Sequence, residues 1–385
     1  MRRTFLKGVL GIAALVATRG AARAQAGEIR IGGLVAASGP GAFIGTSERN
    51  ALEMLVEQKN ARGGIAGNRI RLFLYDTEGN STVAAQQFRR LVESDNVHAV
   101  IGPSTTGESV VVRPTANEAR VPLISMGGAE AIINPPTPYV FKVPPGDRVV
   151  AEHILGFMKA KAMKSVGLIS SADGFGQAGA SVVKEVAQRL GVQVAAAEEF
   201  GPRDTDMTPQ VLRIRRANAD AMLIWSVNPG PTIVLKNAAA VGYNKPVFNS
   251  YGATSQQLIE QAGAAAERSY VSSMRLLAPD TLAEDDPMRE VVARLATDYR
   301  ARFRAEPTTF VGHPHDALEL IDRAVQTSGG QPDRERIAEA IRSGIAFPGA
   351  NGQFRFTAQN HGGLDENSRS MVMLQVRGGR FVLAQ

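Results

Sequence analysis

The chain has 385 residues, no cysteine and a formal net charge of +6. The lack of cysteine excludes disulfides, thiolate metal sites and a thiol nucleophile. The length suits two domains of ordinary size, and a hydrophobic content of 44% is typical of a globular protein.

The first 26 residues have the layout of a cleaved secretory signal. Basic residues precede an apolar run from Val9 to Ala17, and Ala24–Ala26 reads Ala-Gln-Ala, which fits a cleavage site. The apolar run is shorter than the roughly 20 residues that span a bilayer. The string RRTFLK at Arg2–Lys7 favours twin-arginine export over the Sec route. The segment therefore predicts a periplasmic protein.

This segment also explains the basic charge of the chain. It carries five basic residues and no acidic one, so the formal charge falls from +6 to +1 without it. The mature chain has no basic excess, which argues against nucleic acid as a partner. No later stretch is long and apolar enough to span a membrane.

Strand and helix patterns alternate from residue 28 onward. Strands are predicted at Glu28–Val35, Ile70–Tyr75, His98–Ile101 and Pro122–Ser125. Helical spacing falls between them, at Ala51–Val56, Thr82–Val92 and Glu108–Glu118. These βα units predict a largely parallel sheet covered on both faces.

The alternation restarts after Pro144–Gly146. Helices are predicted at Ala151–Ala162, Gln177–Leu190, Pro209–Arg216 and Thr232–Val241. Strands are predicted at Ser165–Ser170, Val192–Glu198, Ala221–Trp225 and Pro246–Asn249. Two such units in tandem indicate an α/β protein with two doubly wound parallel-sheet lobes.

The remainder of the chain has a different pattern. Helices are predicted at Pro287–Arg304, His315–Val325 and Arg334–Arg342. Short alternating strands follow at Phe354–Phe356, Met371–Val376 and Phe381–Leu383. A helical block that crosses back to the first lobe, and a tail that returns to the second, would make three crossings.

The loops that follow the predicted strands are rich in serine, threonine and glycine. They are Ala37–Gly45, Gly102–Glu108, Ser125–Glu130, Ser170–Gly176, Ser226–Pro229 and Ser250–Thr254. Parallel sheets bind ligands beyond the carboxyl ends of their strands. Hydroxyls and helix N-termini can bind a carboxylate there without a formal positive charge. The same residues are also ordinary caps and turns, but six such loops in two tandem units favour a binding site.

Enzymatic and metal-dependent alternatives have weaker support. Gly39 and Gly41 follow a strand, but the third glycine of a dinucleotide motif should stand at Ile44. His313–Asp316 could suggest a metal site, and we interpret it as a helix start instead. No G-x-S-x-G elbow is present. We therefore expect a protein that is not an enzyme and has no cofactor and no metal.

A series of short motifs points to a family. They are Gly32–Leu34, Ser38–Pro40, Lys59–Gly67, Tyr75–Asp76, Val100–Ser104, Val121–Ser125, Gly174–Gly176, Thr205–Pro209 and Ala219–Ala221. In this order and spacing, the mature chain resembles the periplasmic Leu/Ile/Val-binding proteins, which are substrate-binding proteins of ABC importers. The resemblance covers nearly all of residues 28–385.

The resemblance implies a type I periplasmic-binding fold whose lobes are joined by a three-segment hinge. The expected first lobe comprises residues 27–145 and 277–347, and the second comprises residues 146–276 and 348–385. The hinge segments would be Pro144–Asp147, Met274–Leu277 and Phe347–Asn351. The implied partners are a small organic acid or amino-acid-like ligand and the membrane permease of an ABC importer, and we expect a monomer.

The resemblance also implies where a ligand is held. Ser104, Thr105 and Thr106 would bind its carboxylate, helped by the main chain at three consecutive residues, Gly127, Gly128 and Ala129. Phe175 stands where the family places an aromatic ring over the ligand. We add Phe43 and Asn228 to the candidate ligand contacts, and Trp225 as a core residue or stacking platform.

Three positions depart from the family pattern for amino-acid binders. Tyr251 stands where those proteins carry an acidic residue for the ligand ammonium, Val227 replaces a tyrosine and Ala129 replaces a threonine. A buried ammonium needs a carboxylate partner. Our hypothesis is a carboxylate ligand without an α-ammonium, with aromatic acids favoured. Binding of an amino acid or amide, or a role as a periplasmic sensor for a membrane receptor, remain the alternatives.

Overall fold

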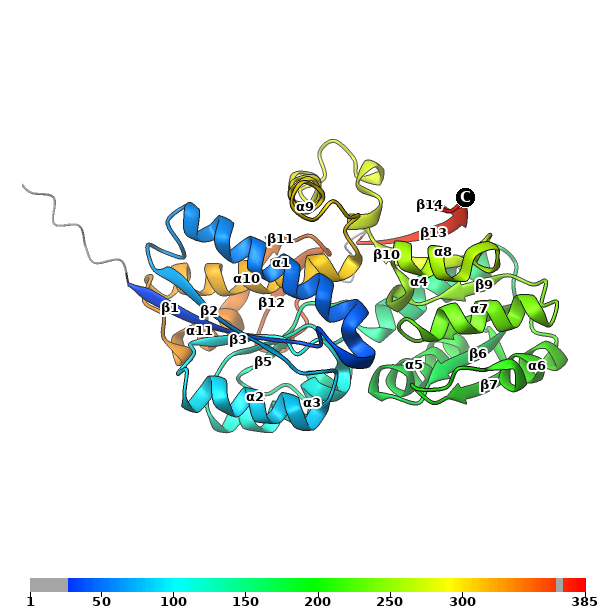
Figure 1. Ribbon diagram of the computed structural model, residues 1–385, viewed down its shortest axis with the longest axis horizontal. Coiled ribbons are helices and arrows are strands. Elements are labelled where there is room, and N and C mark those ends of the chain that lie inside the picture. The colour runs from blue at the N-terminus through cyan, green and yellow to red at the C-terminus, as the bar shows by residue number, and fades with distance from the viewer. Residues whose placement is uncertain (1–26, 365–369) are drawn as a thin grey trace, which may run out of the picture.

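The computed structural model describes residues 27–364 and 370–385. The predicted signal segment lies outside these residues. Two α/β lobes lie side by side (Figure 1). Each is built on its own sheet of mainly parallel strands, so the predicted fold class is confirmed. Within the described ranges, no helix combines the length and apolar character that crossing a membrane requires.

The first lobe contains a five-stranded parallel sheet with the order β2-β1-β3-β4-β5. Its strands are β1 (Glu28–Val35), β2 (Arg69–Asp76), β3 (Ala99–Ile101), β4 (Leu123–Ser125) and β5 (Val140–Lys142). The connecting helices are α1 (Ala42–Ala61), α2 (Ser81–Glu93) and α3 (Thr106–Glu118). All residues of β3 and β4 are buried, as expected for strands covered by helices on both faces.

The second lobe contains a seven-stranded sheet with the order β14-β13-β10-β9-β8-β6-β7. Its parallel strands are β6 (Ser165–Ser171), β7 (Gln193–Phe200), β8 (Ala221–Trp225), β9 (Val247–Asn249) and β10 (Tyr270–Met274). The chain's last two strands, β13 (Met371–Arg377) and β14 (Arg380–Leu383), pair antiparallel at one edge. The helices are α4 (Asp147–Ala160), α5 (Gly174–Leu190), α6 (Thr208–Ala217), α7 (Gly230–Ala240) and α8 (Gln256–Ala262).

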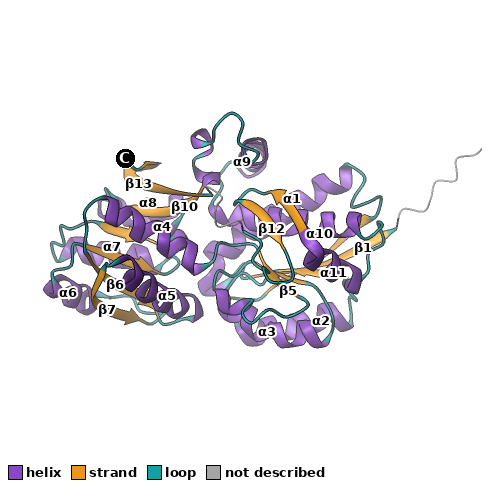
Figure 2. Ribbon diagram, turned by 180° about the vertical axis from the view of Figure 1, so that it is seen from behind, coloured by secondary structure: helices purple, strands orange, loops and turns teal. Residues whose placement is uncertain are grey.

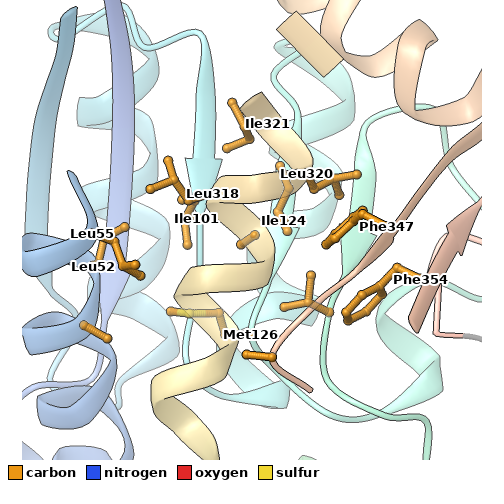
Figure 3. Packing of buried hydrophobic residues seen from close by; sticks show 14 of the residues in the cluster. Leu52, Leu55, Ile101, Ile124, Met126, Leu318, Leu320, Ile321, Phe347 and Phe354 are labelled. Carbon is orange, nitrogen blue, oxygen red and sulfur yellow. The ribbon is translucent and has the colours of Figure 1, made fainter. Parts of the chain in front are cut away.

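Three later helices belong to the first lobe, although they follow the second lobe in the sequence. They are α9 (Arg289–Phe303), α10 (Thr309–Thr327) and α11 (Arg334–Gly344). Figure 3 shows α10 placing Leu318 and Ile321 near Ile101 and Ile124 of the sheet, with Leu52 of α1 beside them. This burial of apolar side chains holds the returning helices on the first lobe.

One expected boundary is wrong. Residues from 348 onward were assigned to the second lobe, but β12 (Gln353–Phe356) pairs antiparallel with β11 (Ile345–Pro348) beside α10 and α11 (Figure 2). Phe347 and Phe354 stack with ring centroids 5.0 Å apart, and Phe356 is fully buried in the same core. This aromatic cluster keeps the segment on the first lobe, so Phe347–Asn351 is not the third crossing. The chain joins the second sheet only at β13.

Candidate ligand-binding cavity

A cavity of about 450 Å³ lies where the two lobes face each other. The first lobe lines it mainly with loops that follow β1, β3 and β4, and the second with loops that follow β6, β7, β8 and β9. This volume lies within the range of small-molecule sites. Among the residues predicted as ligand contacts, those that line it are Ser104, Thr105, Thr106, Gly128, Phe175, Asn228 and Tyr251.

Three predicted contacts are not in this lining. Phe43 instead packs edge-to-face on Phe310, with ring centroids 5.5 Å apart, and Phe310 is the ring that lines the cavity. Gly127 donates its N–H to Ser125 Oγ at 3.0 Å, and Ala129 donates its N–H to Thr106 Oγ1 at 3.3 Å. The main chain at these two positions therefore stabilises the loop after β4, and its N–H groups are already used.

The loop after β3 that carries Ser104, Thr105 and Thr106, here called the hydroxyl loop, already uses part of its hydrogen-bonding capacity within the protein. Ser104 Oγ accepts the N–H of Ala36 at 3.0 Å and donates to Glu48. Thr105 forms a capping box with Glu108 at the start of α3. The cap interpretation is thus correct for Thr105, whereas the Ser104 hydroxyl links the loop after β1 to Glu48.

The first turn of α3 leaves donors for a ligand. The N–H groups of Thr106 and Gly107 have no acceptor within the described part of the chain. The start of α3 is part of the cavity lining, and a helix N-terminus favours negative charge. The loop can therefore receive a carboxylate through its main chain.

The aromatic wall comes from the second lobe. Asp173 accepts the N–H groups of Phe175 and Gly176 at 3.0 and 2.8 Å, so α5 begins at Gly174, three residues before its predicted start. Phe175 meets Tyr251 edge-to-face at 5.6 Å. Burial raises the pKa of the Tyr251 phenol well above its usual range, which keeps the phenol neutral. Trp225 is fully buried outside the lining, and is a core residue.

The lobes touch beside this wall. A Cβ added at Gly128 would lie 2.0 Å from Tyr251 Oη and 3.1 Å from Phe175 Cε2. A Cβ added at Gly174 would lie 3.3 Å from Thr106 Cγ2. Glycine at these two positions therefore permits the close approach of the lobes.

Arg203 and His313 line the cavity but were not predicted as ligand contacts. Arg203 lies in the loop after β7, is exposed, and has no ion-pair partner in the described ranges. Its loop follows the predicted strand Val192–Glu198, so its position carries the same signal as the six loops named above. His313 lines the cavity because α10 begins at Thr309, six residues before its predicted start. The predicted start was too late because proline usually ends or begins a helix, whereas Pro314 lies inside this one.

His313 and Glu48 form a buried polar pair next to the cavity. His313 Nδ1 lies 3.3 Å from Glu48 Oε1, and both side chains are essentially inaccessible. Burial raises the pKa of Glu48 to about 8, partly offset by the hydrogen bond from Ser104. Burial lowers the pKa of His313 to about 3.

No group of three or more potential metal-ligating side chains occurs in the part of the chain that the structure describes.

Two doubly wound lobes that enclose a cavity at their facing strand ends define a bilobal ligand-binding protein. The sequence model of the periplasmic binding protein family matches residues 28–380. The chain therefore belongs to this family, and the resemblance to the Leu/Ile/Val-binding proteins is confirmed.

Individual relatives are distant. The Leu/Ile/Val-binding protein homolog 7 of Brucella suis biovar 1 is 29% identical over 244 residues. That match covers 61% of this chain and 60% of the relative, less than two thirds of its length. An extracellular ligand-binding receptor from Rhodopseudomonas palustris HaA2 has 27% identity and a TM-score of 0.85, covering 93% of this chain and 100% of the receptor. The LivJ substrate-binding protein of Streptococcus pneumoniae, solved with isoleucine, has 25% identity and a TM-score of 0.82, covering 93% and 99%.

Proposed function

We propose that this protein is the extracytoplasmic substrate-binding component of an ABC importer and that it binds a small organic acid, with aromatic carboxylates favoured. It performs no chemistry on its ligand. The observation that carries the ligand class is the charge of the lining. Arg203 is its one arginine or lysine and has no ion-pair partner in the described ranges, while its one acidic residue, Asp173, caps α5.

An amino-acid ligand fits this lining poorly. Its ammonium would need a carboxylate partner, because an unpaired buried charge is strongly unfavourable. Tyr251, at the position expected to face that group, is a neutral phenol, and burial raises the pKa of Glu48 to about 8. These features support a ligand that carries a carboxylate and no amine.

Aromatic rings favour a flat apolar ligand body. Phe175, Tyr251 and Phe310 all line the cavity. The start of α3, with its free N–H groups, belongs to the same lining, so a carboxylate could lie on that helix while the ring packs between the aromatic side chains. Closure of the second lobe over the first would complete the site, and the ligand shifts the population toward this closed form.

Matched ligand pairs test the proposal by isothermal titration calorimetry of the mature protein. The first pair is 3-phenylpropionate and phenylalanine, and the second is 4-methylpentanoate and leucine. Each pair differs in the amine alone. We expect saturable binding of the acids, with the aromatic acid tighter, and no binding of the amino acids.

A third ligand isolates the carboxylate. The amide 3-phenylpropionamide keeps the ring and chain but lacks the negative charge, and we expect it to bind weakly. Tighter binding of leucine than of 4-methylpentanoate would refute the organic-acid proposal and favour the specificity named for the Brucella relative. Mass spectrometry of ligand that co-purifies with the protein would then identify the natural compound.

A further inference from the structure

His313 has a ring nitrogen that the protein does not use. Its side chain is 1% exposed and lines the cavity, and Nε2 has no hydrogen-bond partner in the described ranges. The other ring nitrogen, Nδ1, faces Glu48 at 3.3 Å, so Nε2 points away from that carboxyl group. Buried polar atoms are normally paired with protein, ligand or ordered water, so an unpaired one at a cavity wall is available to a ligand.

The opposite side of this histidine is held firmly. Glu48 lies between His313 and the hydroxyl of Ser104, which donates to Oε2 and also accepts the N–H of Ala36. Phe310 packs edge-to-face on the imidazole, with ring centroids 5.6 Å apart. The chain Ala36–Ser104–Glu48–His313 therefore connects the loops after β1 and β3 to α10 and fixes the orientation of the ring.

We propose that His313 is a ligand-contacting residue that donates its Nε2–H to an oxygen of the bound organic acid, and that Glu48 is a positioning residue that fixes this tautomer. The inference rests on the proposed function for the class of ligand. It adds a contact outside the hydroxyl loop and gives a role to a buried acid that does not touch the ligand.

The protonation states follow from the surroundings. Burial raises the pKa of Glu48 to about 8 and lowers the pKa of His313 to about 3, so both groups are neutral at pH 7. Ser104 donates to Glu48 Oε2, which leaves the carboxyl proton on Oε1, where it faces Nδ1. Nδ1 is then the acceptor, and the ring proton must be on Nε2.

Other charged or titratable groups act on this pair from neighbouring elements. Glu108 of α3 and the Tyr251 phenol interact with Glu48, and Lys142 of β5 and Asp316 of α10 interact with His313. Tyr251 stays neutral, since its pKa is raised well above the usual range. Burial also raises the pKa of Glu108 and lowers that of Lys142 to about 8. Because Lys142 loses charge in the same range as Glu48, the experiment needs a variant that removes Glu48 titration alone.

Deprotonation of Glu48 reverses the role of the histidine. An ionised Glu48 accepts from Nδ1–H, which moves the lone pair to Nε2 and turns a donor toward the ligand into an acceptor. The tautomer that can donate to the ligand is therefore present below the pKa of Glu48 and is lost as pH rises through about 8. Affinity for an organic acid should therefore fall above neutral pH by up to about tenfold per pH unit.

The tautomer can be measured without any ligand. The chain contains five histidines, so ¹⁵N-histidine labelling of the mature protein gives a simple ring spectrum, and loss of one ring in His313→Gln assigns the signal. We expect a neutral ring protonated at Nε2 at pH 7. A ring protonated at Nδ1, or a charged ring, would overturn the inference while leaving the proposed function intact.

Binding of 3-phenylpropionate gives the second test. His313→Phe keeps a ring but removes the donor and should weaken binding about tenfold or more. His98→Gln is the matched control, since His98 lies in the same lobe against Arg30 and outside the cavity lining. Glu48→Gln cannot ionise, so its affinity should be the same at pH 7 and pH 9, whereas that of the unaltered protein falls.

The outcomes separate the two ideas. Failure of the unaltered protein to bind any carboxylate overturns both. Tight binding of 3-phenylpropionate with equal affinity in His313→Phe overturns the inference alone. So does a pH dependence in Glu48→Gln equal to that of the unaltered protein, since Lys142 would then be the titrating group. Far-ultraviolet circular dichroism and thermal unfolding of each variant confirm that it is folded.

Discussion

Gly128→Ala should weaken ligand binding while leaving the separate lobes intact. The three atoms nearest to an added Cβ all belong to the second lobe: Tyr251 Oη at 2.0 Å, Phe175 Cε2 at 3.1 Å and Tyr251 Cζ at 3.3 Å. The backbone φ angle of Gly128 is not positive, so alanine can adopt the same conformation there. The methyl group therefore conflicts with this contact between the lobes and not with the first lobe itself.

The distances set the size of the effect. Ordinary contact begins at 3.4 Å, so the Tyr251 hydroxyl must retreat by about 1.4 Å. Forcing an extra methyl group into a packed contact costs about 1–3 kcal/mol, which corresponds to a loss of about 5- to 150-fold in affinity when only the bound form carries the strain. Adding Tyr251→Phe removes the nearest atom and should reduce the penalty that alanine imposes.

Calorimetry with 3-phenylpropionate measures the loss, and small-angle scattering measures compaction on binding. Gly156→Ala in α4 is the control, because an added Cβ there meets no atom within 4 Å. The thermal midpoint of ligand-free Gly128→Ala should stay close to that of the unaltered protein. Unchanged affinity together with full compaction would refute the reasoning that the lobes meet at Gly128 when ligand is bound.

Three further predictions concern stability. Gly179→Ala would place Cβ 1.8 Å from Nε1 of the buried Trp225, so urea unfolding should show a loss of about 1–3 kcal/mol or more; an unchanged midpoint would contradict the packing. Asp173→Ala removes the cap of α5 and should cost about 1 kcal/mol, and Asp173→Asn should restore most of it in the same assay. Glu48 has a folded pKa of about 8, raised from 4.5, so its contribution to stability is full below pH 4.5 and declines as pH rises through 8. The thermal midpoint of Glu48→Gln should therefore rise relative to the unaltered protein between pH 5 and 8, and a constant difference would be evidence against the buried carboxyl.

Much of the fold was predictable because buried parallel strands leave a clear pattern. Strands such as Ala221–Trp225 are short apolar runs between helices and can be recognised from the sequence, whereas β5, β10 and β11 were not predicted. Phe354–Phe356 was misplaced because its alternation shows a strand but not its partner. Only the stacking of Phe354 on Phe347, which is a tertiary contact, assigns it to the first lobe.

Part of the site could be predicted because parallel sheets bind ligands in the loops that follow their strands. Thr106, Gly128, Phe175 and Tyr251 each follow a strand by a few residues, and all four line the cavity. His313 does not follow a strand: it reaches the cavity because a helix from the third section of the chain packs back across the first lobe. The return of this helix was expected, but neither periodicity nor a local motif shows which of its residues reach the cavity.

In this cavity, the group that can attract a ligand from solution differs from the groups that can hold it after binding. Arg203 is exposed, so it can draw an anion toward the opening without the large desolvation cost of a buried cation. The deeper groups available to the ligand, the N–H groups of α3 and the neutral His313, carry no net charge. Neutral donors form weaker hydrogen bonds to a carboxylate than a charged donor does. In the proposed role, weaker retention would favour release of the ligand to a membrane permease, and replacing His313 by arginine should slow ligand dissociation more than it raises the association rate.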